Sequence, residues 1–130
     1  MTDQRTTDFS TLPPIMAVDF DGTLVVDKFP EIGEEKTYMC RFVRNAQTLG
    51  IRTILWTSRT GKALLEAVEW CEKKGLHFDA VNTNIQEVID LTGTDTRKVF
   101  ANVYLDDRNK MVGESGIKSC VKELMAWLGK

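Results

Sequence analysis

Short apolar runs alternate with segments of helical periodicity along most of this chain, and this alternation limits the possible folds to a few. The apolar runs predict strands at residues 15–20, 51–56, 78–81 and 99–105. Apolar residues at helical spacing predict helices at residues 34–49, 62–74, 85–91 and 117–128. Strands separated by helices pair in parallel through right-handed crossovers. We therefore expect a three-layer α/β/α, Rossmann-like fold around a short parallel sheet of about four strands.

Length and composition indicate one domain. The chain has 130 residues, of which 42% are hydrophobic and 28% are charged, an ordinary balance for a globular protein. Residues 1–12 are expected to form a flexible N-terminal tail, which Pro13 and Pro14 close off. Residues 13–130 are then a single α/β domain, and the segments that connect its elements are too short for a cap domain.

Charge and cysteine usage exclude several classes of protein. The chain has 17 Lys and Arg against 19 Asp and Glu and carries no basic stripe, so a nucleic-acid groove is not expected. No apolar run approaches the length of a membrane span, and the first residues lack an apolar signal core. Cys40, Cys71 and Cys120 form no CxxC pair and are expected to be small buried residues in a reducing compartment. We expect a cytoplasmic protein.

Polar residues follow three of the predicted strands. They are Asp19, Asp21 and Thr23, together with Gly22, at the end of the first strand, Thr57 and Ser58 after the second, and Asp106 and Asp107 after the fourth. The carboxyl ends of parallel strands meet at one edge of the sheet, where ligands bind. Four carboxylates at one edge repel one another unless a cation lies between them. Oxygen ligands favour Mg²⁺, and no thiolate or imidazole near them in the sequence favours a softer metal.

The spacing of the first two acids suggests a reaction. Residues i and i+2 of a strand point the same way, so Asp19 and Asp21 can face one reacting atom. One can attack as a nucleophile, forming an acyl-phosphate, while the other handles a proton. Gly22 allows the backbone to curl around the metal and the phosphate. The Thr57 hydroxyl and the start of the following helix would supply hydrogen-bond donors for phosphate oxygens.

Taken together, these segments resemble the haloacid dehalogenase (HAD) superfamily of phosphohydrolases. MAVDFDGTLV resembles its first motif, ILWTS its second, and VYLDD its acidic fourth motif. FPEIGEE, LWTSRTG, AVEWCEKKGL and RKVFANVYLDDRN extend the resemblance to a small, capless bacterial or phage-type group over nearly everything after Pro14. The resemblance implies a magnesium-dependent phosphomonoesterase that acts through an aspartyl-phosphate.

The resemblance also implies roles for individual residues. Asp19 would be the nucleophile and a Mg²⁺ ligand, and Asp21 the general acid and base, with its backbone carbonyl on the metal. Asp106 would be a metal ligand, and Asp107 a ligand directly or through water. Thr57 would hold the phosphoryl group. Further substrate contacts are expected from Ser58, Arg59, Gly22 and Thr23.

Members of the family also use a lysine that steadies the nucleophile and the phosphoryl group, and Lys98 is the candidate here. It lies only eight residues before Asp106, whereas the family's lysine usually lies well over a dozen before the last acidic motif. An unbroken strand over residues 99–105 would separate the two by roughly 20 Å. Either the strand is shorter, or Arg59 or Lys62 supplies the positive charge.

Other functions stay open from the sequence. A non-catalytic phosphate-binding or interaction module could use the same scaffold. A phospho-acceptor domain of the receiver type also combines acids, a hydroxyl and a lysine, but it has its acid pair on the first strand and its acceptor aspartate on a central one. The partner would be a small phosphorylated substrate or a phosphorylated macromolecule, and a second subunit in a homo-oligomer could act as a lid. The charged segment at residues 31–36 is either an exposed helix start or a flap over the site.

Overall fold

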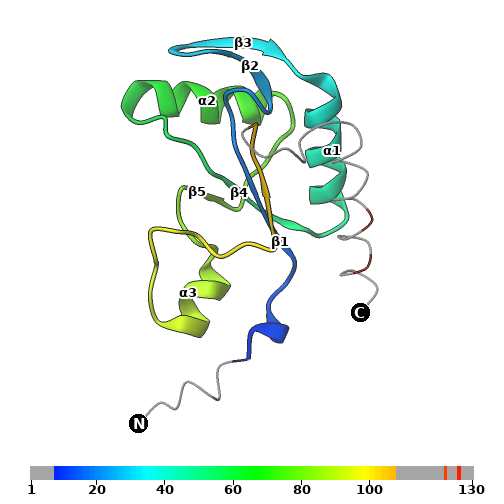
Figure 1. Cartoon of the computed structure of the whole chain (residues 1–130), viewed down its shortest axis with the longest axis vertical. Helices are drawn as coiled ribbons and strands as arrows, with labels where there is room; N and C mark the ends of the chain where they lie inside the picture. Colours follow the sequence, from blue (N-terminus) through cyan, green and yellow to red (C-terminus); the bar gives the residue numbers. More distant parts are fainter. Residues whose placement is uncertain (1–7, 108–121, 123–125, 127–130) are drawn as a thin grey trace.

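A four-stranded parallel sheet forms the centre of the structure, a computed structural model that describes residues 8–107, 122 and 126 (Figure 1). The strand order is β5-β4-β1-β6. The strands are β1 (Ile15–Val18), β4 (Arg52–Leu55), β5 (Ala80–Val81) and β6 (Val103–Leu105). The helices are α1 (Thr37–Thr48), α2 (Gly61–Lys73) and α3 (Gln86–Thr92). The predicted α/β class with a short parallel sheet is confirmed, and the helix predicted at residues 117–128 lies outside the described residues.

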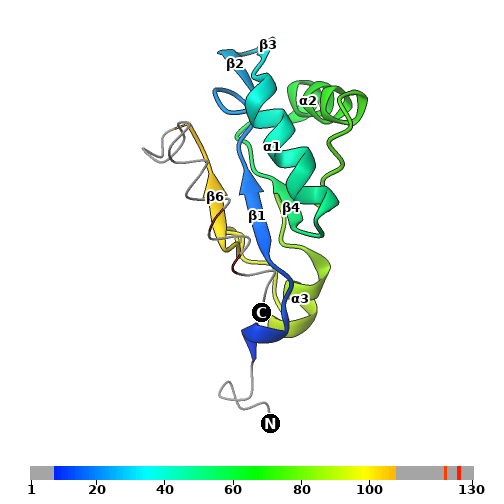
Figure 2. The same cartoon turned by 90° about the vertical axis from the view of Figure 1, so that its right-hand side faces the viewer.

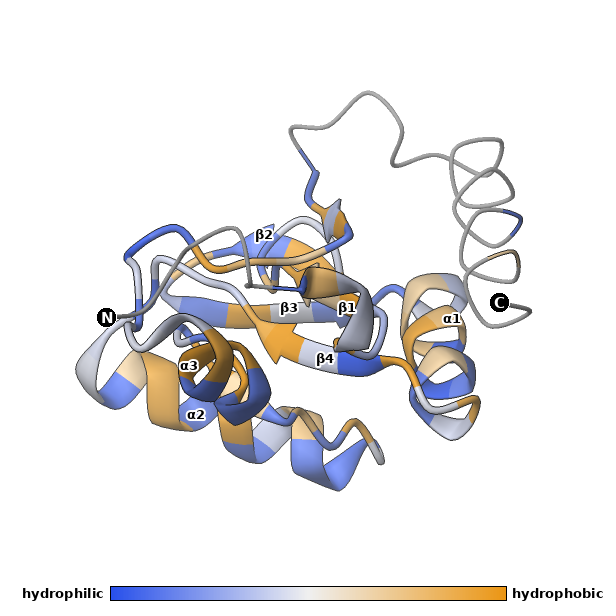
Figure 3. Ribbon diagram, turned by 90° about the horizontal axis from the view of Figure 1, so that it is seen from below, coloured by the Kyte–Doolittle hydropathy of each residue, from blue (hydrophilic) through white to orange (hydrophobic). Residues whose placement is uncertain are grey.

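β1 is buried on both faces because it lies between two other strands and two apolar clusters. Met16 and Val18 belong to a cluster with α1 and α2, which lie on the same side of the sheet in Figure 2. Ile15 and Ala17 belong to a second cluster, which includes Val88 of α3. Figure 3 shows that β4 is hydrophobic toward its end and that α1 and α2 carry both hydrophobic and hydrophilic residues, as expected for amphipathic helices.

Two of the three cysteines lie in the first of these clusters. Cys40 of α1 and Cys71 of α2 are buried and form no disulfide. Burial raises the pKa of the Cys40 thiol to about 11 and that of the Cys71 thiol to about 12, so both are uncharged at neutral pH. These two cysteines therefore act as small apolar side chains, as predicted, while Cys120 lies outside the described residues.

A two-stranded antiparallel hairpin replaces the start of the helix predicted at residues 34–49. Its strands are β2 (Val25–Lys28) and β3 (Glu31–Glu35), and α1 begins only at Thr37. The two hairpin strands pack closely at Gly33, where an added Cβ would lie 2.0 Å from the carbonyl oxygen of Val26. Helical periodicity did not reveal this hairpin because the charged residues of β3 also suit the first turn of a helix.

The last strand and the N-terminal segment also differ from expectation. β6 begins at Val103 because the side chain of Asn102 ends the regular backbone pairing with β1. The Ile15 N–H donates to Asn102 Oδ1 at 2.8 Å, and the Asn102 N–H donates to the Ile15 carbonyl at 2.8 Å. Residues Phe9–Thr11 form one turn of 3-10 helix, Leu12 is buried, and the Phe9 ring stacks on Phe100.

Within the described part of the chain, no helix is long and apolar enough to cross a membrane.

The buried centre of the sheet predicts the effect of shortening a core side chain. Leu55 of β4 is 1% exposed, and we expect Leu55→Ala to lower the free energy of unfolding by about 2–5 kcal/mol through lost burial and a new cavity. Leu65 of α2 is 65% exposed, and Leu65→Ala is the matched control, with a change within about 0.5 kcal/mol. Urea unfolding measures both. Equal losses in the two variants would contradict this packing.

Candidate functional site

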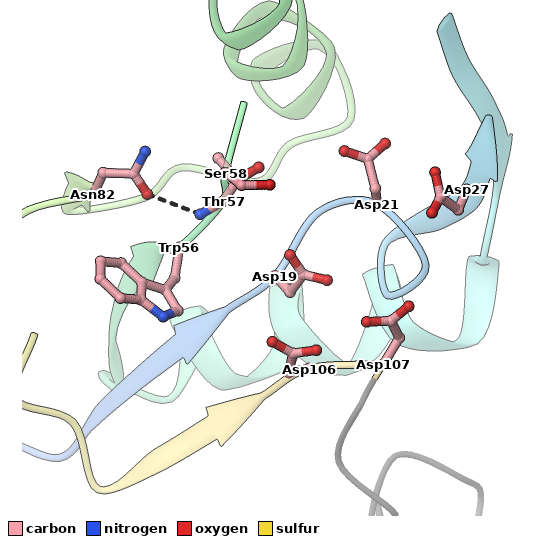
Figure 4. Close-up of a pocket in the computed structure, with 9 residues that line it drawn as sticks. All are labelled: Asp19, Asp21, Asp27, Trp56, Thr57, Ser58, Asn82, Asp106 and Asp107. Atoms are coloured by element: carbon pink, nitrogen blue, oxygen red, sulfur yellow. Dashed lines mark hydrogen bonds between the residues drawn. The ribbon is translucent and has the colours of Figure 1, made fainter. Parts of the chain in front are cut away.

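An acidic pocket of about 510 Å³ lies where β1, β4 and β6 end (Figure 4). Its lining comprises Asp19, Asp21, Asp27, Trp56, Thr57, Ser58, Asn82, Asp106 and Asp107. The structure therefore brings together the acids and the hydroxyl residues that the sequence places after three different strands. Asp27 of β2, Trp56 and Asn82 are additional members of the lining.

Backbone hydrogen bonds between neighbouring strands hold the strand ends in register. The Asp19 N–H donates to the carbonyl of Leu105 at 2.8 Å, one residue beyond the end of β1. The Trp56 N–H donates to the carbonyl of Val18 at 2.8 Å on the other side of β1. Asp19, Asp106 and Thr57 are thus positioned by the ends of the sheet rather than by free loops.

Three of the carboxylates form a compact cluster. Asp19, Asp106 and Asp107 each offer a carboxylate oxygen, and these oxygens all lie within 4.8 Å of one another. Gly22 makes room for the third, because its φ is +86° and an added Cβ would lie 2.2 Å from Asp107 Oδ2. A set of closely spaced carboxylate oxygens suits a hard divalent cation such as Mg²⁺. We infer that these three residues can hold a metal ion.

The electrostatics of the pocket show how unfavourable this cluster is by itself. Burial, together with the negative charges of Asp106, Asp107 and Asp21, raises the pKa of Asp19 to about 7. The backbone N–H of Phe20 acts in the opposite direction by hydrogen bonding to the carboxylate. Without a cation Asp19 therefore keeps its proton up to about neutral pH, and a bound cation would favour its charged form.

Thr57 is held by Asn82, the residue that follows β5, whose role as its partner the sequence did not indicate. Asn82 Oδ1 accepts a hydrogen bond from the Thr57 N–H at 2.8 Å (Figure 4), and the Asn82 N–H donates to the carbonyl of Leu55 at 2.8 Å. Asn82 has a φ of 56°, in the left-handed region that asparagine tolerates better than most residues. The feature of the sequence that points to Asn82 as a residue of the site is its position directly after a predicted strand. The Thr57 hydroxyl oxygen accepts the Arg59 N–H at 3.1 Å, which leaves its own proton free to be donated.

Asp21 lines the pocket, but its carboxylate points away from Asp19 (Figure 4). Both of its oxygens accept hydrogen bonds from the guanidinium of Arg59, each at 2.8 Å. The side chain of Arg59 is 1% exposed and does not line the pocket. The structure does not bring Arg59 into direct contact with the space that a substrate would occupy. Thr23 lies deeper, with its hydroxyl 3.4 Å from Asp19 Oδ2.

The predicted lysine lies elsewhere. The Lys98 ammonium is 5.7 Å from the centre of the Tyr104 ring, and Lys98 lines a separate pocket with Phe9 and Phe100. Lys62, at the start of α2, lines a groove beside the hairpin. Lys36 contacts the acidic loop, because its ammonium donates to the carbonyl of Gly22 at 2.7 Å. Among the described residues that line the acidic pocket there is no lysine or arginine.

The raised pKa of Asp19 predicts a pH-dependent stability in protein treated with a chelator. Folding raises the pKa of this carboxyl from its ordinary 3.8 to about 7, so the folded state binds more protons than the unfolded state between these values. The free energy of unfolding should therefore fall as pH rises from 4 to 7, relative to Asp19→Asn, which cannot titrate there. Urea unfolding at a series of pH values in EDTA measures the difference. Parallel profiles for the two proteins would contradict the raised pKa.

One solved structure places the chain among known proteins. No family model matches the chain, and no curated protein matches it. The chain is similar to the structure of a conserved protein coded by a locus from Bacteroides thetaiotaomicron, with 38% sequence identity and a TM-score of 0.73. The match covers 86% of this chain and 92% of that one. With this identity over most of both chains, the protein belongs to the same family as that conserved Bacteroides thetaiotaomicron protein.

Proposed function

We propose that this protein is a phosphomonoester hydrolase of the HAD type, which uses Mg²⁺ and forms a phosphoryl intermediate on Asp19. The observation that carries the proposal is the cluster of Asp19, Asp106 and Asp107 oxygens within 4.8 Å of one another. Thr57 and Asp21 line the same pocket. The residues that the resemblance to HAD phosphohydrolases would use as nucleophile, metal ligands, hydroxyl donor and second acid therefore line one pocket, which supports the proposal.

The reaction would proceed in two displacements. An Asp19 carboxylate oxygen attacks the phosphorus, the bond from phosphorus to the ester oxygen breaks, and Asp21 gives the departing oxygen a proton. Asp21 then takes a proton from a water molecule, which attacks the phosphorus and breaks its bond to Asp19. Inorganic phosphate leaves and both carboxyl groups return to their first state. Bound Mg²⁺ would supply positive charge that offsets the carboxylates and the transferring phosphoryl group.

The remaining residues of the pocket would orient the substrate. Thr57 can donate its hydroxyl proton to a phosphoryl oxygen, and Asn82 keeps the Thr57 backbone in place. The indole of Trp56 and the amide of Asn82 form the pocket wall on the β5 side of Asp19 (Figure 4). The substrate would be a small phosphorylated compound or a phosphorylated group on a macromolecule.

A non-catalytic phosphate-binding module is the second candidate. It is favoured by the lack of a lysine or arginine among the described residues that line the pocket, because HAD enzymes use a lysine to steady the phosphoryl group. The two candidates differ in turnover. Both would need a divalent cation, since the carboxylate cluster by itself repels a phosphate anion.

Hydrolysis of p-nitrophenyl phosphate tests the proposal. We expect turnover that requires Mg²⁺ and a loss of at least about 10³-fold in kcat for Asp19→Asn, because the variant lacks the attacking carboxylate. Asp90→Asn, an equivalent change at an exposed position of α3, is the control and should retain wild-type activity.

The outcomes separate the candidates. Undiminished hydrolysis by Asp19→Asn would overturn the assignment of the nucleophile. A wild-type protein that turns over no phosphate ester, but whose melting temperature rises with Mg²⁺ and phosphate together, would be a binding module instead.

A further inference from the structure

Arg59 is the largest fully buried side chain among the described residues, and it joins three separate segments. Its guanidinium contacts the Asp21 carboxylate after β1, the turn between β2 and β3, and the first turn of α2. A buried guanidinium is costly unless its charge and its N–H groups are paired. The groups that pair with the Arg59 guanidinium therefore show which segments of the molecule this side chain holds together.

All five guanidinium N–H groups have an acceptor within the protein. Nε and Nη2 each donate to one oxygen of Asp21 at 2.8 Å. Nη2 also donates to the carbonyl of Glu31 at 2.9 Å, and Nη1 donates to the carbonyls of Pro30 at 3.1 Å and Ala63 at 3.3 Å. Since an arginine side chain has five such donors, none is left for a substrate. We call these contacts the Arg59 network.

Two aromatic rings cover the guanidinium. Its central carbon lies 5.1 Å from the centre of the Phe20 ring and 5.1 Å from the centre of the Phe29 ring. Phe20 lies between the two aspartates of the first motif, whereas Phe29 belongs to the hairpin turn and is 58% exposed. The hairpin thus covers Arg59 from the solvent side and accepts its hydrogen bonds through two backbone carbonyls.

The geometry of Asp21 suits a proton donor and acceptor held at a fixed place. In an in-line displacement the leaving oxygen lies on the side of the phosphorus opposite the nucleophile, so a group that serves it must stand apart from Asp19. Asp21 lines the pocket with its carboxylate turned away from Asp19 (Figure 4). Among the described residues, the hydrogen bonds to this carboxylate come from the guanidinium of Arg59, which therefore sets its orientation. A planar bidentate fork fixes direction as well as distance, which a lysine cannot do.

We propose that Arg59 is a positioning residue that holds Asp21 in place for proton transfer and couples it to the β2–β3 hairpin. The catalytic part of this inference rests on the proposed phosphatase function, whereas the coupling to the hairpin does not. Arg59 acts through Asp21 and does not touch the substrate. The hairpin turn, through Pro30 and Glu31, is the structural support of this arrangement.

Leaving-group dependence tests the catalytic part. An alkyl phosphate needs a proton on its departing oxygen, whereas p-nitrophenolate leaves without one. We expect Arg59→Lys and Asp21→Asn each to lower kcat at least about tenfold for an alkyl phosphate, with a smaller loss for p-nitrophenyl phosphate and little change in KM. The double variant should be no slower than Asp21→Asn alone, because both changes remove one function. Arg41→Lys, at an exposed position of α1, is the matched control.

Hydrogen exchange tests the coupling without any need for activity. Arg59→Lys and Asp21→Asn should both speed amide exchange over residues 25–35, while exchange in β4 stays at the wild-type rate. Asp21→Asn retains the size of the side chain and leaves Arg59 in place, so it gives a result even if Arg59→Lys fails to fold.

Each outcome decides one of the two proposals. Unchanged exchange in the hairpin of Asp21→Asn would overturn the coupling. If the wild-type protein hydrolyses both esters and Arg59→Lys hydrolyses them equally fast, the positioning role is overturned while the phosphatase proposal stands. The same conclusion follows if the losses of the two single variants add in the double variant. A wild-type protein that hydrolyses neither ester would overturn the phosphatase proposal and the positioning role with it, and exchange would still decide the coupling.

Discussion

Repulsion among Asp19, Asp106 and Asp107 is the constraint on which the rest of the site depends. Their carboxylate oxygens lie within 4.8 Å of one another, and the pKa of Asp19 is raised to about 7 as a result of burial and its acidic neighbours. An arrangement of this kind persists only where the surrounding structure enforces it. Here the backbone bond from Asp19 to Leu105 and the absence of a side chain at Gly22 enforce it. The apolar clusters on the two faces of β1 supply the stability that this requires.

The two acids of the first motif have opposite surroundings, although only one residue separates them. Asp19 has acidic neighbours and suits a metal ion, whereas Asp21 is paired with Arg59, the only basic side chain that contacts it in the described residues. Different environments are the usual way in which two carboxyl groups acquire two roles. The hairpin contributes to this difference because its turn supplies two of the carbonyl groups that hold Arg59.

Much of the sheet could be predicted because each strand is apolar and ends at a polar residue. The runs at 15–20 and 51–56 contain β1 and β4, and Asp19 and Thr57, at the ends of these runs, lie at the pocket as the parallel pairing requires. The hairpin was missed because EIGEE has no strong strand pattern and is stabilised by pairing with β2. The shorter β6 follows from the side chain of Asn102, which bonds to Ile15, a partner 87 residues away. Pairing partners this distant leave no local signal in a sequence.

The sequence by itself determined the α/β class and the group of acids at one edge of the sheet. Both follow from residues that are close together in the sequence, namely the spacing of apolar residues and the polar residues at the ends of the strands. Only the tertiary structure decided which basic and amide side chains lie close to these acids and which do not. Arg59 contacts a carboxylate 38 residues away, Asn82 contacts a backbone amide 25 residues away, and Lys98 lies outside the pocket. These relations depend on how side chains from different elements fill the same space. Periodicity reports which face of an element is buried, and not which residue of another element it meets.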